Sequence, residues 1–106
     1  MFNALPIVIT GGVRVGWKNS SWPFAKLTIE KDTLYLQGPL QSNLVFSAKE
    51  ELEICVEKHC LLGLPIGIRI HHQQRETPEP IVFWYLRPKK LINILKGTDF
   101  RGKIRE

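Results

Sequence analysis

The side chains that could bind a metal ion are few, and their spacing does not match a metal site. The cysteines and histidines of the sequence are Cys55, His59, Cys60, His71 and His72. The Cys55–Cys60 spacing is not one that zinc sites use, and the adjacent His71 and His72 would point to opposite faces of a strand. We therefore predict no metal site and no structural disulfide. Cys55 is expected on the less buried side of a strand, and Cys60 in the loop that follows.

The residue types used in catalysis also lack a catalytic arrangement. The candidate nucleophiles are Ser20, Ser21, Ser42 and Ser47. They lie in predicted turns or at strand starts, without the glycines of a nucleophile elbow. The glycine-rich stretch 11–16 is not followed by the Gly-Lys-Ser/Thr of a phosphate-binding loop, so bends in the first strand explain it better. Glu51, Glu53 and Glu57 fit the solvated face of a strand. We predict no catalytic residue, no cofactor and no enzymatic activity.

Basic residues outnumber acidic ones by fifteen to ten, which gives a net charge of +5. Such an excess permits attraction to nucleic acid or to an anionic lipid surface. Arg14, Lys18 and Lys26 flank a polar turn at residues 19–21 and are the candidate anion site. The cations of the tail, from Lys96 to Arg105, are the alternative.

Aromatic residues interleaved with lysine could stack on the bases of single-stranded nucleic acid. Trp22 and Trp84, however, begin or lie within apolar runs, which favours burial. Trp17, beside Lys18, is the aromatic residue that we expect to be exposed. Nucleic acid is therefore not an expected partner.

Glycine and proline divide the chain into short apolar runs of strand length. The first predicted strand is 7–10, interrupted by Gly11-Gly12 and resumed over 13–17; the others are 24–30, 33–37, 43–47, 52–57, 66–71 and 81–86. The segment from Ser47 also carries a Ser-x-x-Glu helix-capping pattern, but Leu52, Ile54 and Val56 fit the period of a strand better. Near the end, Pro88 and Gly97 bound a segment with helical period, which predicts one C-terminal helix.

The period of each run predicts which side chains form the core. These are Leu27, Ile29, Leu34, Leu36, Ile54, Val56, Ile68, Ile70, Val82 and Trp84, with Leu91 and Leu95 of the helix sealing one end. This phase places Ile81, Phe83 and Tyr85 on the outer face of the last strand, where they would form an apolar interaction patch. The candidate partner interface is accordingly Trp17, Phe83 and Tyr85. The alternative is that Trp17, the N-terminal segment or the C-terminal tail covers the patch.

One amphipathic helix cannot cover both faces of a seven-stranded sheet. The sheet must therefore curl into a barrel or split into a sandwich, with the helix at an open end. A chain of 106 residues suits a single domain, 1–106. It has no apolar stretch long enough for a spanning helix and no basic region before its short N-terminal apolar run, so we expect a cytoplasmic protein.

Several motifs, in this order, resemble a known family. They are Gly11-Gly12, Gly16, Trp22–Leu27, Gly67–His72, Pro80–Trp84 and Lys96–Phe100, and they extend over about Leu5 to Phe100. Their order and spacing resemble the pleckstrin-homology (PH) superfold, which includes GRAM-like domains, and are similar to small bacterial PH-like proteins. The resemblance implies a mainly β (α+β) fold, a seven-stranded bent antiparallel barrel capped by one C-terminal helix. It also implies binding, because some members hold phosphoinositide head groups and many hold peptides or neighbouring domains.

The expected function is thus a non-catalytic PH-like binding or scaffold module for a protein partner or a second copy of the chain. The alternative is weak peripheral binding to anionic lipid head groups through Arg14, Lys18 and Lys26, which would place the protein at the membrane surface. The dense Lys-x-Arg pattern of lipid-binding members is absent from this region. The fold itself does not decide between the two.

Overall fold

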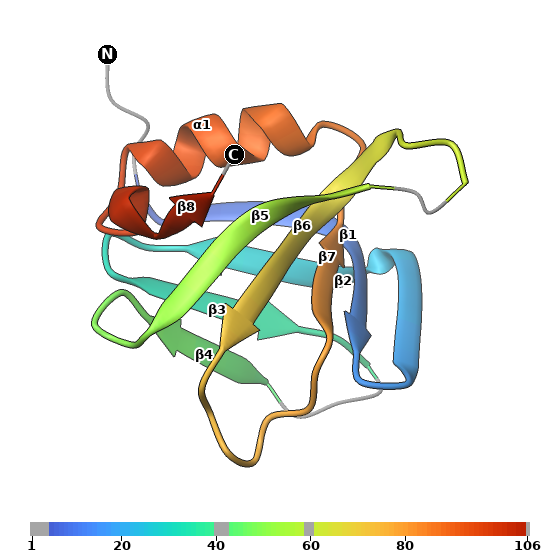
Figure 1. The fold of residues 1–106 in the computed structure, drawn as a ribbon, viewed down its shortest axis with the longest axis horizontal. Coiled ribbons are helices and arrows are strands. Elements are labelled where there is room, and N and C mark those ends of the chain that lie inside the picture. The colour runs from blue at the N-terminus through green and yellow to red at the C-terminus, as the bar shows by residue number, and fades with distance from the viewer. Residues whose placement is uncertain (1–4, 40–42, 59–60, 106) are drawn as a thin grey trace.

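The computed structural model of the protein describes residues 5–39, 43–58 and 61–105 (Figure 1). Within them the chain forms β1 (Ile7–Val15), β2 (Lys18–Ile29), β3 (Thr33–Gln37), β4 (Leu44–Ser47), β5 (Leu52–Lys58), β6 (Pro65–His72), β7 (Ile81–Trp84), α1 (Pro88–Lys96), a 3-10 turn η1 (Arg101–Lys103) and β8 (Ile104–Arg105). The strands make one sheet in the order β4-β3-β2-β1-β7-β6-β5-β8. All neighbours are antiparallel except β8, which runs parallel to β5.

The sheet curls strongly into a half-barrel, and α1 lies across one end of it (Figure 1). Leu91, Ile92 and Leu95 of α1 are buried in the core. The predicted mainly β fold with one C-terminal helix is confirmed. The structure adds an eighth strand that the sequence analysis did not predict, because a two-residue run such as β8 carries no periodic signal.

β1 connects the two halves of the curled sheet. It pairs with β2 on one side, and its second half pairs with β7 on the other. The β1–β2 register shifts between Gly11, which faces Ala25, and Val13, which faces Ser20. Residues 21–24 of β2 therefore stand opposite Gly12 alone, as an irregular excursion from the ladder.

Glycines permit the close approach of β7 to its two neighbours. A Cβ atom on Gly67 would overlap the carbonyl oxygen of Phe83, and one on Gly11 would overlap the carbonyl oxygen of Trp84. A Cβ on Gly12 would lie 2.8 Å from the carbonyl oxygen of Ser20 in β2. These positions need glycine because neighbouring backbone occupies the side-chain space.

Most of the predicted core is confirmed. The predicted core residues that are buried in the main apolar cluster are Leu27, Ile29, Leu34, Leu36, Ile54, Ile68, Ile70, Leu91 and Leu95. Val56 is partly buried against this cluster. In the β5 segment, Glu50 accepts a hydrogen bond from the Ser47 backbone N–H at 2.7 Å, so the capping pattern closes a turn before the strand.

The predicted phase of β7 is wrong. Ile81 and Phe83 are fully buried in the core, whereas Trp84 lies on the outer side and is partly exposed. Val82 is buried, as predicted, but it does not belong to the main apolar cluster. Residues 81–86 are apolar at nearly every position, so their own sequence gives no alternation to read. The phase is set by pairing with β1, where Val13 faces Phe83 and both side chains point into the core.

The burial of Trp22 was also predicted incorrectly. Its side chain is 68% exposed. Trp22 lies within the β2 excursion opposite Gly12, where the alternation of the strand is interrupted. Buried residues resume at Ala25, where the regular ladder with β1 resumes.

Replacing Gly67 by Ala tests the close approach of β6 and β7. We expect Gly67→Ala to lower the free energy of unfolding by about 1–3 kcal/mol, because the new methyl group overlaps the Phe83 carbonyl and the strands must shift. Gly102→Ala is the matched control, since nothing lies within 4 Å of its Cβ position; its effect should stay within about 0.5 kcal/mol. Equal urea-unfolding midpoints for the two variants would contradict this packing.

Truncating Phe83 tests the corrected phase of β7. We expect Phe83→Ala to lower the free energy of unfolding by about 3–5 kcal/mol, because the ring is fully buried. Trp17→Ala, which removes an aromatic side chain that is 83% exposed, should change stability by no more than about 0.5 kcal/mol. Chemical denaturation measures the free energy of unfolding of both variants. An unchanged stability of Phe83→Ala would contradict the burial of this side chain.

Candidate functional site

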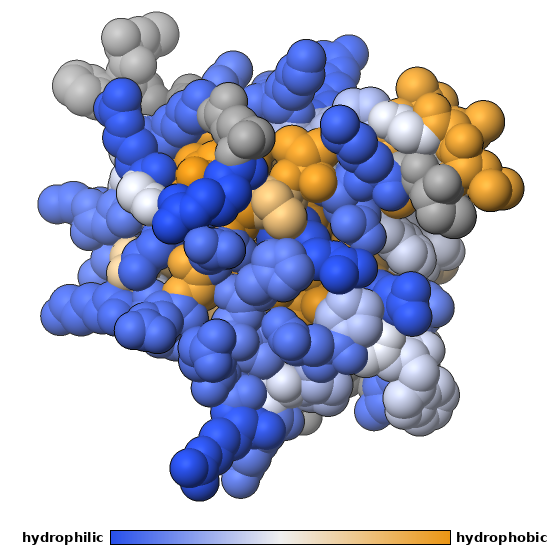
Figure 2. Space-filling model, viewed as in Figure 1, coloured by the Kyte–Doolittle hydropathy of each residue, from blue (hydrophilic) through white to orange (hydrophobic). Residues whose placement is uncertain are grey.

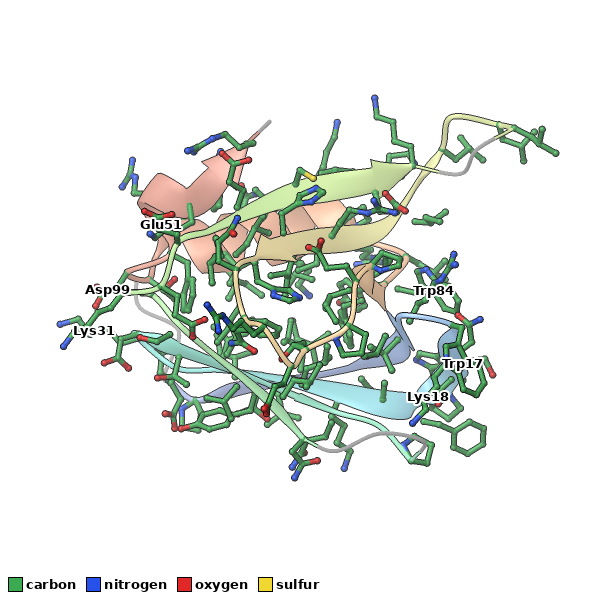
Figure 3. All side chains as sticks on the ribbon, turned by 60° about the horizontal axis from the view of Figure 1, so that its bottom comes forward. Trp17, Lys18, Lys31, Glu51, Trp84 and Asp99 are labelled. Carbon is green, nitrogen blue, oxygen red and sulfur yellow. The ribbon has the colours of Figure 1, made fainter. Side chains whose placement is uncertain are left out.

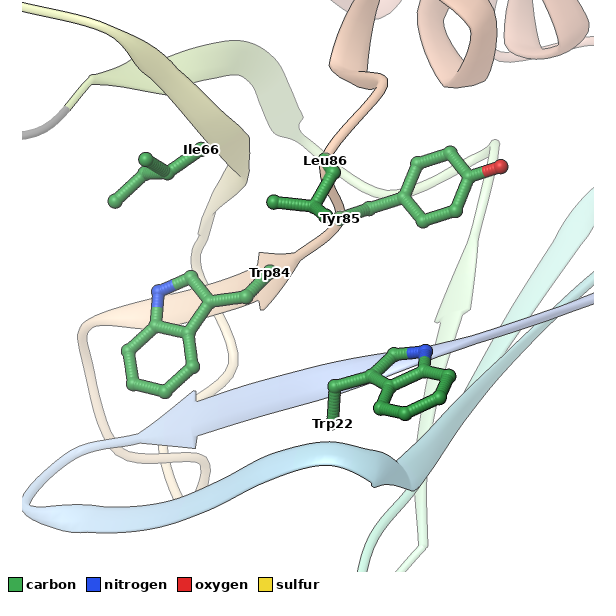
Figure 4. A pocket seen from close by; sticks show the side chains of 5 residues that line it. All are labelled: Trp22, Ile66, Trp84, Tyr85 and Leu86. Atoms are coloured by element: carbon green, nitrogen blue, oxygen red, sulfur yellow. The ribbon is translucent and has the colours of Figure 1, made fainter.

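The most apolar hollow described on the surface is a cleft at the β7 junction. It has a volume of about 510 Å³ and is lined by Trp22, Ile66, Trp84, Tyr85 and Leu86 (Figure 4). The lining comes from β2, β6 and β7 and from the segment that leads to α1. Hereafter we call this hollow the apolar cleft.

Backbone pairing holds the walls of the apolar cleft in place. In the sheet register, Trp84 lies between Gly12 of β1 and Gly67 of β6. The indole packs against Gly12, where an added Cβ would lie 3.1 Å from its Cε3 atom. Beyond the strand, the Tyr85 backbone N–H donates a hydrogen bond of 2.9 Å to the Ile66 carbonyl oxygen. The glycines thus leave room on the outer face for the Trp84 side chain.

The opposite wall comes from the excursion in β2, which carries Trp22 to the surface. Figure 4 shows Trp22 and Trp84 on different strands of the same hollow, with Leu86 and Ile66 across from them. Leu86 is 91% exposed. A cleft bordered by such exposed apolar side chains can remove an apolar group from water, so the chemistry it offers is binding.

More apolar side chains are exposed in two connections of the chain outside the cleft. Trp17 and Phe24 are exposed on the β1–β2 hairpin, and Leu61, Leu62 and Leu64 are exposed in the β5–β6 connection. Figure 2 shows the β5–β6 group as an apolar patch on the surface. Apolar surface that is gathered in this way marks an interaction site.

Comparison of the chain with protein-family models, with curated proteins and with solved structures finds no match. What this site can do therefore follows from its geometry and its chemistry. Among the described residues, no helix is both long enough and apolar enough to cross a membrane.

The three residues predicted as an anion site do not form one cluster. Lys26 faces Thr10 of β1, whereas Lys18 faces Val15, five residues further along the strand. At about 3.3 Å per residue, this separates the two lysines by roughly 16 Å along the sheet. The Lys18 ammonium lies 5.9 Å from the centre of the Trp17 ring, in a cation–π contact at the hairpin end.

Arg14 lines a hollow on the outer face together with another arginine, Arg69. It points to the outer face, where Val82 separates it in the register from Arg69 of β6. The Arg14 Nε–H donates to the Gly16 carbonyl oxygen at 3.0 Å. Arg69 pairs with Glu57 at 3.2 Å, and Glu79 lines the hollow between the two arginines. These carboxylates offset the positive charge of the arginines.

The predicted partner interface divides among three environments. Trp17 is exposed, as predicted, but it does not line the apolar cleft. Phe83 is in the core, so its expected place on the outer face is wrong. Tyr85 is partly buried and lines the apolar cleft.

The remaining four lining residues were not predicted from the sequence. Two of them, Trp22 and Trp84, were assigned to the core because they occur in apolar runs. One signal could have found the cleft, since a strand that is apolar on both faces needs something to cover its outer face. The outer face of β7 is only partly covered, and the uncovered part is the hollow beside Trp84.

The described residues contain no group of three or more His, Cys, Asp or Glu side chains that could hold a metal ion. His59 and Cys60 lie outside the described residues. His71 is exposed and His72 is buried, which confirms that these neighbours point to opposite faces. Burial raises the pKa of the Cys55 thiol; nearby Arg69 lowers it, and Glu57 and Glu53 add to the increase.

The raised pKa of Cys55 predicts a slowly reacting thiol. In a Cys60→Ser variant, which leaves Cys55 as the one cysteine, we expect iodoacetamide at about pH 8 to alkylate the folded protein several-fold more slowly than the urea-unfolded chain. The thiolate is the reactive form, so the rate in the folded protein should keep rising at higher pH than in the unfolded chain. Mass spectrometry follows the reaction. Identical pH profiles for the two states would contradict the shift.

Proposed function

We propose that this protein is a non-catalytic binding module of PH-like architecture, and that its apolar cleft receives an apolar segment of a protein partner. The observation that carries the proposal is the apolar cleft itself, an open hollow bounded almost entirely by apolar side-chain surface. Its volume of about 510 Å³ falls within the range of sites that hold small ligands or protruding side chains.

The PH-like part of the proposal has two supports. One is the order of the sequence motifs that resemble the superfold. The other is the antiparallel succession β4-β3-β2-β1-β7-β6-β5 in a strongly curled sheet, followed by one C-terminal helix. Members of this superfold are binding modules, as the resemblance implies, and a binding role agrees with the chemistry of the apolar cleft.

The energetics of the apolar cleft favour a partner. Two of its lining residues, Trp22 and Leu86, keep most of their surface in water. Burying apolar surface contributes about 25 cal/mol per Å², and aromatic side chains carry a large share of the energy at interfaces. The polar side-chain groups in the lining are a phenol and two indole N–H groups, which suit orientation of a ligand rather than bond-making chemistry.

Weak binding to anionic lipid is the second candidate function. The observation that favours it is the β1–β2 hairpin, where exposed Trp17 lies beside Lys18. An aromatic ring next to a cation suits the interface of a membrane. The hollow shape of the apolar cleft, however, suits a protruding side chain better than the plane of a bilayer.

The dye anilinonaphthalene sulfonate (ANS), an aromatic ring system that carries one sulfonate group, tests whether the cleft binds apolar rings. We expect ANS to bind the folded protein with increased fluorescence, and Trp22→Ala and Leu86→Ala each to weaken binding by about fivefold or more, equivalent to about 1 kcal/mol. Both side chains are exposed, so stability should change little.

The matched control for this experiment is Val45→Ala, which shortens an exposed aliphatic side chain on β4, away from the apolar cleft. It should leave ANS binding unchanged. Equal affinity in all three variants would overturn the proposal.

Sedimentation with vesicles of neutral and anionic lipid tests the second candidate function, binding to anionic lipid. Lys18→Glu should abolish binding to anionic vesicles if the β1–β2 hairpin is the contact.

A further inference from the structure

A second hollow, bordered by charged residues, lies beside the apolar cleft. This neighbour has a volume of about 410 Å³ and is lined by Pro65, Leu86, Arg87, Pro88, Lys89 and Lys90. Leu86 lines both hollows, and Pro65 precedes the cleft residue Ile66 in β6. The two hollows therefore adjoin at Leu86, and we call them together the groove, with the apolar cleft at one end and a basic end bordered by Arg87, Lys89 and Lys90 at the other.

The basic end carries three cations and no compensating carboxylate among the described residues that line it. Arg87, Lys89 and Lys90 are all exposed. They occupy the N-cap and first turn of α1, where the helix has no acidic residue and no side-chain cap. Helices favour negative charge at this end, so the lysines add to the positive charge of the helix terminus.

We infer that the partner segment is an acidic amphipathic peptide, whose apolar side chain enters the apolar cleft while its carboxylates face Arg87, Lys89 and Lys90. This inference rests on the proposed function and names the partner for the same site. It is argued from charge complementarity. A peptide with an apolar anchor followed by Asp or Glu matches both ends of the groove, and electrostatic complementarity supplies specificity and a fast association rate.

A second copy of the chain fits this groove poorly. In a two-fold symmetric dimer the same patch meets itself. Whichever ends of the two grooves meet, neither copy offers the other a carboxylate for its cations, because the described residues that line the two hollows include no Asp or Glu. The net charge of +5 on each chain also opposes association of two copies.

The placement of the lysines points to function rather than stability. Positive charge in the first turn opposes the helix dipole, so these residues weaken α1 in the free protein. A local rule that is broken without a folding benefit is typical of a functional site. Carboxylates of a bound peptide would supply the negative charge that this helix end lacks.

Selection from a random-peptide library, followed by titration of the enriched peptide, tests the inference. We expect the enriched peptides to combine an aromatic or large aliphatic residue with neighbouring Asp or Glu. The double variant Lys89→Glu/Lys90→Glu should weaken binding of the enriched peptide about tenfold or more. Its Tm should rise by roughly 2–5 °C, because the new carboxylates favour the helix terminus.

Lys31→Glu is the control, because it makes one of the same Lys→Glu replacements on the side of the molecule opposite Trp84 (Figure 3). It should leave peptide affinity within about twofold of the original. If the groove variant loses affinity because it unfolds, its Tm falls instead of rising, and Lys89→Gln/Lys90→Gln then gives the test, with an expected loss of about threefold or more.

Four outcomes would overturn the inference. One is enrichment of peptides without acidic residues. Another is an acidic peptide that binds Lys89→Glu/Lys90→Glu as tightly as it binds the unsubstituted protein. The third is no enrichment at all, and the fourth is tighter binding to anionic vesicles than to any peptide. Trp22→Ala separates the two proposals. If Trp22→Ala abolishes peptide binding while the charge variants do not, binding in the apolar cleft is supported and the acidic partner is contradicted. If Trp22→Ala has no effect, both proposals are contradicted.

Discussion

The close approach of β7 to β1 and β6 is the constraint on which the rest of this structure depends. β1 belongs to both halves of the curled sheet, and its pairing with β7 joins them. The approach of β7 to β1 requires glycine at Gly11, and its approach to β6 requires glycine at Gly67, because the backbone of β7 occupies the space of both side chains. With β7 held so closely, Phe83 points into the core and helps to fill the interior of the half-barrel.

The same junction produces the candidate site. Side chains alternate along a strand, so burying Phe83 turns its neighbour Trp84 to the outer face. Gly12 gives the indole room, and the excursion of β2 opposite Gly12 brings Trp22 to the other side of the hollow. Core and apolar cleft are therefore two faces of one packing arrangement, and a change that loosens β7 alters both.

Local sequence predicted those features that depend on local period. The alternation around Leu27 and Ile29 gave the second half of β2 and its buried face, and the bounded helical period gave α1. The turn predicted at residues 19–21 is wrong, because β2 begins at Lys18 and Asn19 and Ser20 pair with β1. The phase of β7 could not be predicted in this way, because it is set by pairing with β1, which is distant in sequence. The candidate site depends on that phase and on the β2 excursion, so most of its residues were missed, and Lys26 was grouped with cations from which the register separates it.

Two features of the groove oppose the stability of the free protein, and one kind of partner would relieve both. Exposed Leu86 and Trp22 leave apolar surface in water, and the lysines beside them oppose the dipole of α1. An uncharged apolar ligand would cover the first and leave the second, whereas a simple anion would do the reverse. A segment that carries both an apolar side chain and carboxylates would cover the apolar surface and also neutralise the positive charge at the start of α1. Because Leu86 lines both hollows, these groups must lie close together in the segment.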